Sequence, residues 1–178
     1  MFSHLPQDFA ERAQQIKLAV FDVDGVLSDG QLYFMADGSE AKAFSTLDGQ
    51  GMKLLQQSGV ELAIITGRAS KAVEHRVKNL GINYLYQARE DKITALNELL
   101  ADLGLSYAQV AYLGDDLPDL AVIRRVGIGA AVNNAHFFVK QHAYFTTHAN
   151  GGFGAAREFC DALMYGQGTL DAVLQRYL

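Results

Sequence analysis

The stretch DVDG, residues 22–25, places two carboxylates directly after an apolar run at residues 17–21. Side chains two apart on an extended strand point the same way, about 6.5 Å apart, so we expect Asp22 and Asp24 to address one bound group. Buried like charges are costly unless something compensates them. A hard divalent cation with oxygen ligands, Mg²⁺, is the simplest compensating partner.

Other polar side chains follow later apolar runs and suit the same chemistry. In parallel α/β sheets the ligand site lies beyond the carboxyl ends of the strands, so these residues should meet at one edge. A hydroxyl and two cations among them suit phosphate oxygens, and the carboxylates suit the metal. The set comprises Thr66, Arg68, Lys92, Asp115, Asp116 and Asp119.

Each motif alone has a simpler interpretation. Asp-Gly pairs are common in turns, so DVDG by itself is typical of a loop. The segment GDDLPDL could be a capped helix start, because Pro118 suits a first helical turn. Together, in this order and at the ends of strands, the motifs indicate a site for Mg²⁺ and a phosphate group.

The elements that must position these residues alternate between strand and helix. Such alternation predicts a Rossmann-like α/β fold with a parallel sheet and helices on both faces. We expect strands at 17–21, 60–66, 83–87, 109–116, 128–132 and 143–147. We expect helices near the N-terminus, at 48–59, 70–81, 91–104, 119–127 and 134–141, and from about 153 to 178.

Residues 30–46 interrupt this alternation with a predicted β-hairpin, because two β-prone stretches flank Asp37-Gly38. A lone hairpin is not stable in water, so it must pack on its own domain or on another copy of the chain. We favour another copy, since the hairpin carries apolar residues expected to be exposed. These are Leu32, Tyr33, Phe34, Met35 and Phe44.

Composition narrows the class of protein. The chain has 178 residues, a net charge of −5 and one cysteine, Cys160. We therefore expect a single domain over residues 1–178, with no disulfide framework and no general nucleic-acid or membrane-surface binding. No signal-peptide or membrane-spanning run is evident, which predicts a cytoplasmic protein.

The ordered motifs DVDGV, ITGR, Lys92 and GDDLPD resemble those of the haloacid dehalogenase superfamily of phosphohydrolases. The resemblance implies that Asp22 attacks phosphorus to form an aspartyl phosphate and that Asp24 acts as general acid and base. It implies that Thr66 and Lys92 hold the phosphoryl oxygens. Mg²⁺ would bind Asp22, the backbone carbonyl of Asp24 and Asp115, with Asp116 and Asp119 orienting its waters or Lys92.

Other members of this superfamily carry a cap domain after the first motif, whereas this chain has only the hairpin and a helix there. Its finer pattern, including LDGQGMKLL and HANGGFGAARE, resembles the 3-deoxy-D-manno-octulosonate 8-phosphate phosphatases, which are homotetramers of lipopolysaccharide biosynthesis. One departure is Leu47, where an arginine is expected. The resemblance implies substrate contacts by Asp24, Ser45, Thr46, Leu47, Asp48, Gly49, Lys53, Arg68, Arg76 and Lys92.

Several alternatives stay open on the sequence. The substrate could be another phosphorylated sugar acid, such as a sialic-acid-type 9-phosphate. A non-enzymatic phospho-acceptor domain is a remote alternative, because its aspartate should follow a middle strand. The glycine-rich tail, with Arg157, could reach the site of a neighbouring subunit. His148 suits a surface loop or a substrate contact equally, and the other histidines show no metal-ligand pattern.

Overall fold

The computed structural model describes residues 2–178 and contains a six-stranded parallel sheet. This arrangement confirms the predicted fold class. All pairings within the sheet are parallel. The strand order is β5 (Tyr84–Tyr86), β4 (Glu61–Ile65), β1 (Leu18–Phe21), β6 (Val110–Gly114), β7 (Ile128–Ala131) and β8 (Phe145–Thr146).

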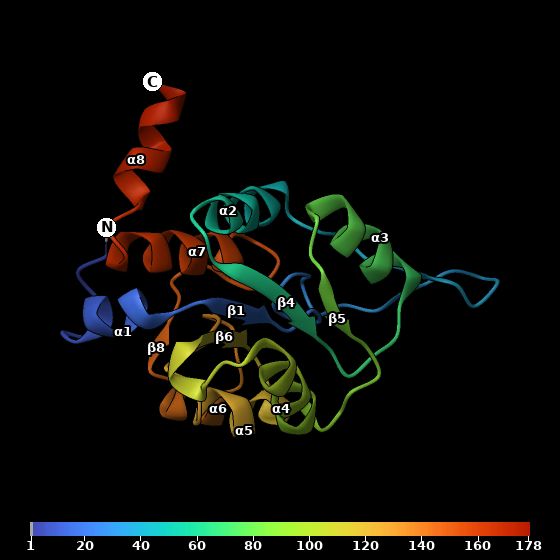
Figure 1. Ribbon diagram of the computed structural model, residues 1–178. Coiled ribbons are helices and arrows are strands. Elements are labelled where there is room, and N and C mark those ends of the chain that lie inside the picture. Colours follow the sequence, from blue (N-terminus) through green and yellow to red (C-terminus); the bar gives the residue numbers. More distant parts are fainter. Residues whose placement is uncertain (1) are drawn as a thin grey trace.

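Helices cover both faces of the sheet (Figure 1). One face carries α2 (Thr46–Gln57), α3 (Lys71–Leu80) and α7 (Ala155–Gly166); the other carries α4 (Lys92–Leu103), α5 (Leu120–Ile123) and α6 (Phe137–His142). Right-handed crossovers produce this division, because the chain moves one way from β1 through β5 and the other way from β6 through β8. The ends of the chain add α1 (Phe9–Gln15) and α8 (Leu170–Leu174).

The reversal of strand order beside β1 determines where a ligand can bind. The carboxyl ends of β4, β1 and β6 lie side by side at this switch point. Doubly wound sheets bind their ligands in the crevice outside such a point. The three predicted motifs that begin at Asp22, Thr66 and Asp115 follow these three strands directly.

The core makes the switch point rigid. Strands β1, β6 and β7 are buried along their whole length, and one continuous apolar cluster joins them to helices from both faces. The ring of Phe21 on β1 meets that of Phe159 on α7 edge to face, with centroids 5.6 Å apart. Such aromatic packing stabilises beyond simple burial of area.

Three helices differ from their predicted bounds. Ser45 accepts a hydrogen bond from the backbone of Asp48, so α2 begins at Thr46 rather than at 48. The segment predicted as a helix over 119–127 begins earlier, with a 3-10 turn at Leu117–Asp119 that Asp116 caps, and continues as only four residues of α5. The helix predicted from 134 begins at Phe137, with His136 as its cap.

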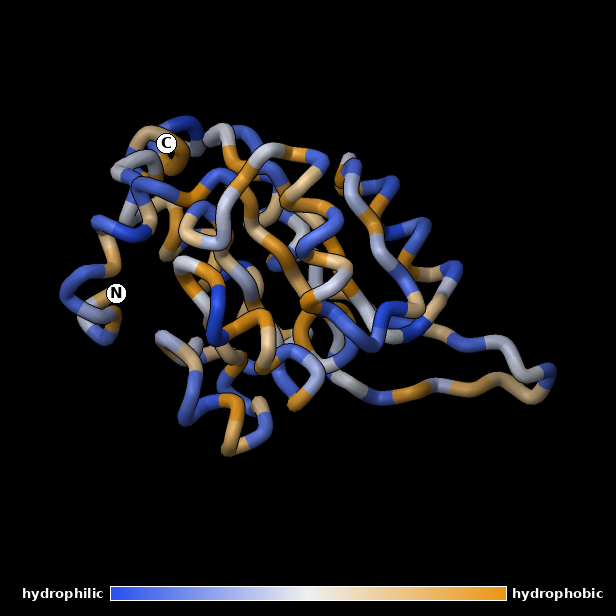
Figure 2. The backbone as a smooth tube through the Cα atoms, turned by 60° about the horizontal axis from the view of Figure 1, so that its bottom comes forward, coloured by the Kyte–Doolittle hydropathy of each residue, from blue (hydrophilic) through white to orange (hydrophobic). Residues whose placement is uncertain are grey.

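The predicted hairpin is present, although its strands β2 (Tyr33–Phe34) and β3 (Glu40–Ala41) are short. Gly38 has φ +82° at the turn, a conformation that glycine adopts without strain. Figure 2 shows the hairpin extending from the body, with hydrophobic residues mainly along one of its arms. Leu32, Tyr33, Phe34 and Met35 are exposed as expected. Phe44 is not: it is partly buried against the core, under the guanidinium of Arg76.

Within residues 2–178, no helix combines the length and the apolar character that crossing a bilayer requires.

Candidate active site

A hollow of about 350 Å³ opens at the switch point. Its walls come from the loops after β1, β4 and β6 and from the start of α4. The structure thus brings together eight of the predicted site residues. The lining residues are Asp22, Asp24, Gly30, Thr66, Gly67, Arg68, Glu90, Lys92, Asp115, Asp116, Pro118 and Asp119.

Lys92 joins two buried carboxylates at the floor of this hollow. Its Nζ lies 2.9 Å from Asp22 Oδ1 and 2.6 Å from Asp119 Oδ1, and all three side chains are almost inaccessible to solvent. Burial, followed by the charge of Asp119, raises the pKa of Asp22 to about 7 despite the nearby ammonium. One lysine therefore does not compensate the negative charge gathered here.

Asp115 completes an acidic cluster with Asp22 and Asp119, whose oxygens lie within 4.8 Å of one another. Burial and the charge of Asp22 raise the pKa of Asp115 to about 8. Both oxygens of Asp119 already have hydrogen-bond donors: they accept from Lys92, from Tyr112 and from the backbone N–H groups of Asp115 and Asp116. Asp22 and Asp115 are therefore the carboxylates free to bind a divalent cation, and the site fits Mg²⁺.

Two glycines of the motifs make room for these carboxylates. Gly25 has φ +88°, and a Cβ there would lie 2.2 Å from Asp115 Oδ2. A Cβ on Gly114 would lie 2.5 Å from Asp119 Cγ. A side chain at either position would displace a carboxylate, which explains glycine in both DVDG and GDD.

The side chain of Asp24 does not join the acidic cluster of Asp22, Asp115 and Asp119. The strand ends at Phe21 and the chain then turns, so Asp24 points toward Lys42 and Arg68 rather than into the acidic cluster. Lys42 Nζ pairs with Asp24 and also lies 2.8 Å from Glu40 Oε1, while Arg68 Nη2 lies 2.5 Å from Glu40 Oε2. The Asp24 side chain nonetheless lines the same hollow.

Lys42 is a site residue that sequence reasoning missed. Its side chain is 1% exposed and its ammonium is held by Asp24 and Glu40. Nothing local indicates this role, since a lysine beside a hairpin strand is usually solvated. The one available signal is that the hairpin follows Asp24 at once and so must return close to it.

Comparisons with known proteins agree with this geometry. A family model for haloacid dehalogenase-like hydrolases matches residues 84–158. The 3-deoxy-D-manno-octulosonate 8-phosphate phosphatase KdsC of Yersinia pestis is 44% identical over 170 residues, covering 96% of this chain and 91% of that protein. KdsC of Escherichia coli K12 is 46% identical over 164 residues, covering 92% and 87%. The chain belongs to the KdsC family.

Solved structures show the same fold throughout the chain. A KdsC-type phosphatase from Moraxella catarrhalis, crystallised with magnesium, phosphate and KDO, has a TM-score of 0.95 and 42% identity, covering 97% of this chain and 100% of that one. A probable YrbI family phosphatase from Pseudomonas syringae has a TM-score of 0.95 and 62% identity, covering 97% and 98%. The predicted family resemblance is thereby confirmed.

Most of the remaining predicted substrate residues form a second group, outside the acidic hollow. Asp48 is buried and accepts hydrogen bonds from the backbone N–H groups of Gly154 and Arg157, so it holds the start of α7. Arg76 donates to the carbonyl of Ser45 at 2.8 Å. Gly49 lies beside it: a Cβ there would be 2.3 Å from Arg76 Nη2, so a side chain would displace the guanidinium.

Three further predicted residues of the KdsC pattern lie on the surface. Thr46 and Leu47 are exposed at the first turn of α2, and Leu47 borders a separate hollow of about 390 Å³ beside Arg157. Lys53 is exposed farther along α2 and lines another surface depression with Gln56 and Lys78. The structure of one chain therefore does not bring these three to the acidic hollow.

The glycine-rich tail contacts the motif loop of its own chain. Gly152 N–H donates to the carbonyl of Val26 at 2.8 Å, and a Cβ on Gly151 would lie 1.6 Å from the Gly25 carbonyl oxygen. The guanidinium of Arg157 is bound by Asp161 at 2.7 Å. Within one chain, the tail thus supports the loop that carries Asp22 and Asp24.

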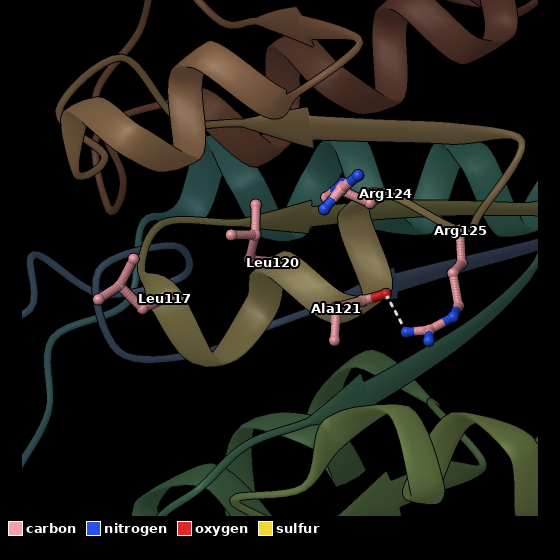
Figure 3. A pocket seen from close by; sticks show the side chains of 5 residues that line it. All are labelled: Leu117, Leu120, Ala121, Arg124 and Arg125. Carbon is pink, nitrogen blue, oxygen red and sulfur yellow. Dashed lines mark hydrogen bonds between the residues drawn. The ribbon is translucent and has the colours of Figure 1, made fainter.

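A separate hollow of about 550 Å³ lies over α5 and is lined by Leu117, Leu120, Ala121, Arg124 and Arg125 (Figure 3). Arg125 donates to the carbonyl of Ala121 at 3.1 Å, which closes the end of that short helix. None of the acidic cluster lines this hollow, so we place the chemistry at the switch point.

The raised pKa values predict how pH affects the metal-free protein. The folded state holds protons on Asp22 and Asp115 up to about pH 7 and 8, whereas their ordinary value is 3.8. This contribution to stability is complete below pH 3.8 and is lost as pH rises through those two values. In EDTA we expect the Tm to fall between about pH 5 and pH 8.

Mg²⁺ should reverse this loss, because the ion replaces the protons. Differential scanning fluorimetry at several pH values, with EDTA or with Mg²⁺, measures both effects. We expect Mg²⁺ to raise the Tm more at pH 8 than at pH 5, since protons compete with it at the lower pH. An equal Mg²⁺ effect at both values would mean that the carboxylates do not bind the ion.

Proposed function

We propose that the protein hydrolyses 3-deoxy-D-manno-octulosonate 8-phosphate to KDO and inorganic phosphate in lipopolysaccharide biosynthesis, with Mg²⁺ as cofactor. The observation that carries the proposal is the pairing of Asp22 and Asp115 over Lys92 at the switch point. The KdsC relatives, which cover nearly the whole chain, support the substrate.

Asp22 is the nucleophile in this proposal. One of its carboxylate oxygens attacks phosphorus in line, forming an O–P bond while the bond from phosphorus to the sugar oxygen breaks. Lys92 and Thr66 hold the phosphoryl oxygens, and both are buried in the same hollow. Asp119 positions Lys92 through its 2.6 Å contact.

Asp24 is the general acid and base. It gives a proton to the departing sugar oxygen and then takes one from the water that attacks the aspartyl phosphate. That attack releases phosphate and restores the Asp22 carboxylate. Its position at the rim, beside Lys42 and Arg68, suits this task because the leaving group departs on the side away from the acidic cluster.

Asp22, Asp115 and the backbone carbonyl of Asp24 would hold Mg²⁺, which supplies charge to draw the phosphate dianion toward the carboxylates. Asp116 is exposed at the edge of the hollow and would orient bound water. Arg68, with a side chain 45% exposed, is placed to meet the sugar acid. In this proposal Ser45, Thr46, Leu47, Asp48, Gly49, Lys53 and Arg76 shape or contribute to a sugar-acid site completed on assembly.

Phosphate release from a panel of phosphorylated sugar acids tests the function. We expect the highest kcat/KM for 3-deoxy-D-manno-octulosonate 8-phosphate, and loss of activity in EDTA that excess Mg²⁺ restores. A sialic-acid-type 9-phosphate is the competing substrate. A higher kcat/KM for that compound would mean that it is the substrate instead. Undiminished turnover in EDTA would mean that the reaction does not require the metal.

We further propose that the chain acts as one domain over residues 1–178 and assembles in the cytoplasm as a homotetramer. The continuous core from Phe9 to Val173 supports one domain, and the unpaired Cys160 suits a reducing compartment. The exposed hairpin supports assembly, since Phe34 and Met35 are 64% and 58% exposed.

Light scattering checks the assembly. We expect a species larger than a dimer for the parent protein and a smaller species for Phe34→Asp, because a charge on the hairpin opposes burial against another copy. Lys78→Met, an exposed change on α3, is a control that should assemble normally. A monomeric parent protein would contradict the proposal.

A further inference from the structure

A second group of possible metal ligands lies away from the acidic hollow and takes no part in the proposed reaction. It consists of His4, before α1; His148, between β8 and α7; and Glu158, in the first turn of α7. One ligand atom from each lies within 4.8 Å of the others. The group joins the N-terminal segment to the loop that precedes α7.

The distances within this group match those between ligands of one ion. Glu158 Oε1 lies 3.1 Å from His148 Nδ1 and 3.6 Å from His4 Nε2. Two ligands of a tetrahedral Zn²⁺, each about 2.1 Å from the metal, lie about 3.4 Å apart. The ring centroids of His4 and His148 are 4.0 Å apart with an interplanar angle of 76°, so the two rings pack edge to face beside Glu158.

His4 supplies a second, independent observation. Both of its ring nitrogens are buried, and neither has a hydrogen-bond partner among the described residues. Buried imidazole nitrogens are ordinarily satisfied, so an unpartnered pair beside a carboxylate points to a missing ligand. Glu158 Oε1, which lies 3.6 Å from His4 Nε2, is beyond hydrogen-bond distance but is placed to share an ion with it.

Glu158 is held in place by backbone N–H groups and by the ring of His148, whose Nδ1 lies 3.1 Å from Glu158 Oε1. Its Oε2 accepts hydrogen bonds from the N–H groups of His148 and Ala149 at 3.0 Å and 2.9 Å. A carboxylate fixed in this way is preorganised for a metal, because its orientation does not depend on the ion. The adjacent cation, Arg157, is engaged by Asp161 and so does not occupy the carboxylate.

The site is open to ions and to a fourth ligand. The His148 side chain is 70% exposed, and both His148 and Glu158 line the hollow of about 390 Å³. We propose that His4, His148 and Glu158 bind a transition-metal ion of the Zn²⁺ class, with water in the remaining position. Imidazole and carboxylate ligands in this ratio favour Zn²⁺ over Mg²⁺, which prefers oxygen alone. The bound ion would fasten the N-terminal segment to α7.

Equilibrium dialysis against Zn²⁺, with Mg²⁺ in large excess to occupy the acidic hollow, tests the proposal. We expect the full-length protein to bind Zn²⁺ and its Tm to rise on binding. His148→Ala should weaken Zn²⁺ binding at least about tenfold and abolish the Tm rise. This variant keeps the backbone N–H that Glu158 accepts, so it should fold normally.

Matched variants separate this site from the active site. His4→Ala should weaken Zn²⁺ binding as His148→Ala does, whereas His75→Ala, an exposed histidine on α3, should bind like the parent protein. Asp22→Asn should retain the histidine-dependent binding, since it alters only the acidic hollow. The proposal is overturned if the parent protein binds no Zn²⁺, or if His4→Ala and His148→Ala bind it as tightly as the parent protein.

Discussion

Asp22→Asn should lower kcat by at least about 10³-fold while leaving the protein folded. The amide cannot act as the nucleophile, so no aspartyl phosphate can form. Folding should not suffer, because burial already raises the pKa of Asp22 to about 7 and a neutral group fits this position. Lys92 keeps its contact with Asp119 in the variant.

Single-turnover phosphate release and circular dichroism measure the two halves of this prediction. Asp102→Asn, an exposed aspartate on α4, makes the same chemical change outside the site and should have parental activity. A rate for Asp22→Asn within a few-fold of the parent protein would show that another group takes the phosphoryl group.

Lys92→Met should lower the free energy of unfolding by about 3–5 kcal/mol at pH 8 in EDTA. Methionine preserves much of the side-chain volume but removes the ammonium that contacts Asp22 and Asp119. Both carboxylates are nearly inaccessible to water, so, among the described residues, Asp22 would lose its only nearby cation and Asp119 would keep only its hydrogen bonds from Tyr112 and the backbone. The variant should also lose phosphatase activity, because the cation that holds the phosphoryl oxygens is gone.

Conditions that neutralise the carboxylates should reduce this destabilisation. At pH 5 Asp22 is protonated in the folded state, given its pKa of about 7, and Mg²⁺ at pH 8 supplies replacement charge. Urea unfolding under the three conditions measures the differences. Lys78→Met, on the exposed side of α3, is the control and should change stability little. If Lys92→Met lowers the free energy of unfolding by the same amount under all three conditions, the loss comes from packing rather than from uncompensated charge.

The acidic hollow was predictable because its parts are local to strand ends. Asp22, Thr66 and Asp115 each follow a buried apolar run, and parallel strands present their carboxyl ends at one edge. The glycines of the motifs also fit this arrangement: the absence of a side chain at Gly25 leaves space for the Asp115 carboxylate, and at Gly114 for the Asp119 carboxylate. Chemical type, spacing and order along the chain were therefore enough to identify these residues.

The contacts that join distant segments could not be predicted from the sequence. Asp48 accepts hydrogen bonds from the backbone of Gly154 and Arg157, which lie 106 and 109 residues farther along the chain. Arg76, on α3, donates to the carbonyl of Ser45 and covers Phe44, which was expected to be exposed as part of the hairpin. Local patterns in the sequence do not predict such long-range contacts.

The amino-acid sequence by itself determined the order of strands and helices, the carboxylates at the switch point and the kind of group they bind, because strand ends and periodicity are local properties. Only the tertiary structure decided that Asp24 turns away to meet Lys42, that Asp119 is saturated by hydrogen bonds and that His4 meets Glu158. These outcomes depend on which distant side chains compete for the same buried space and the same hydrogen bonds, which residue spacing does not specify.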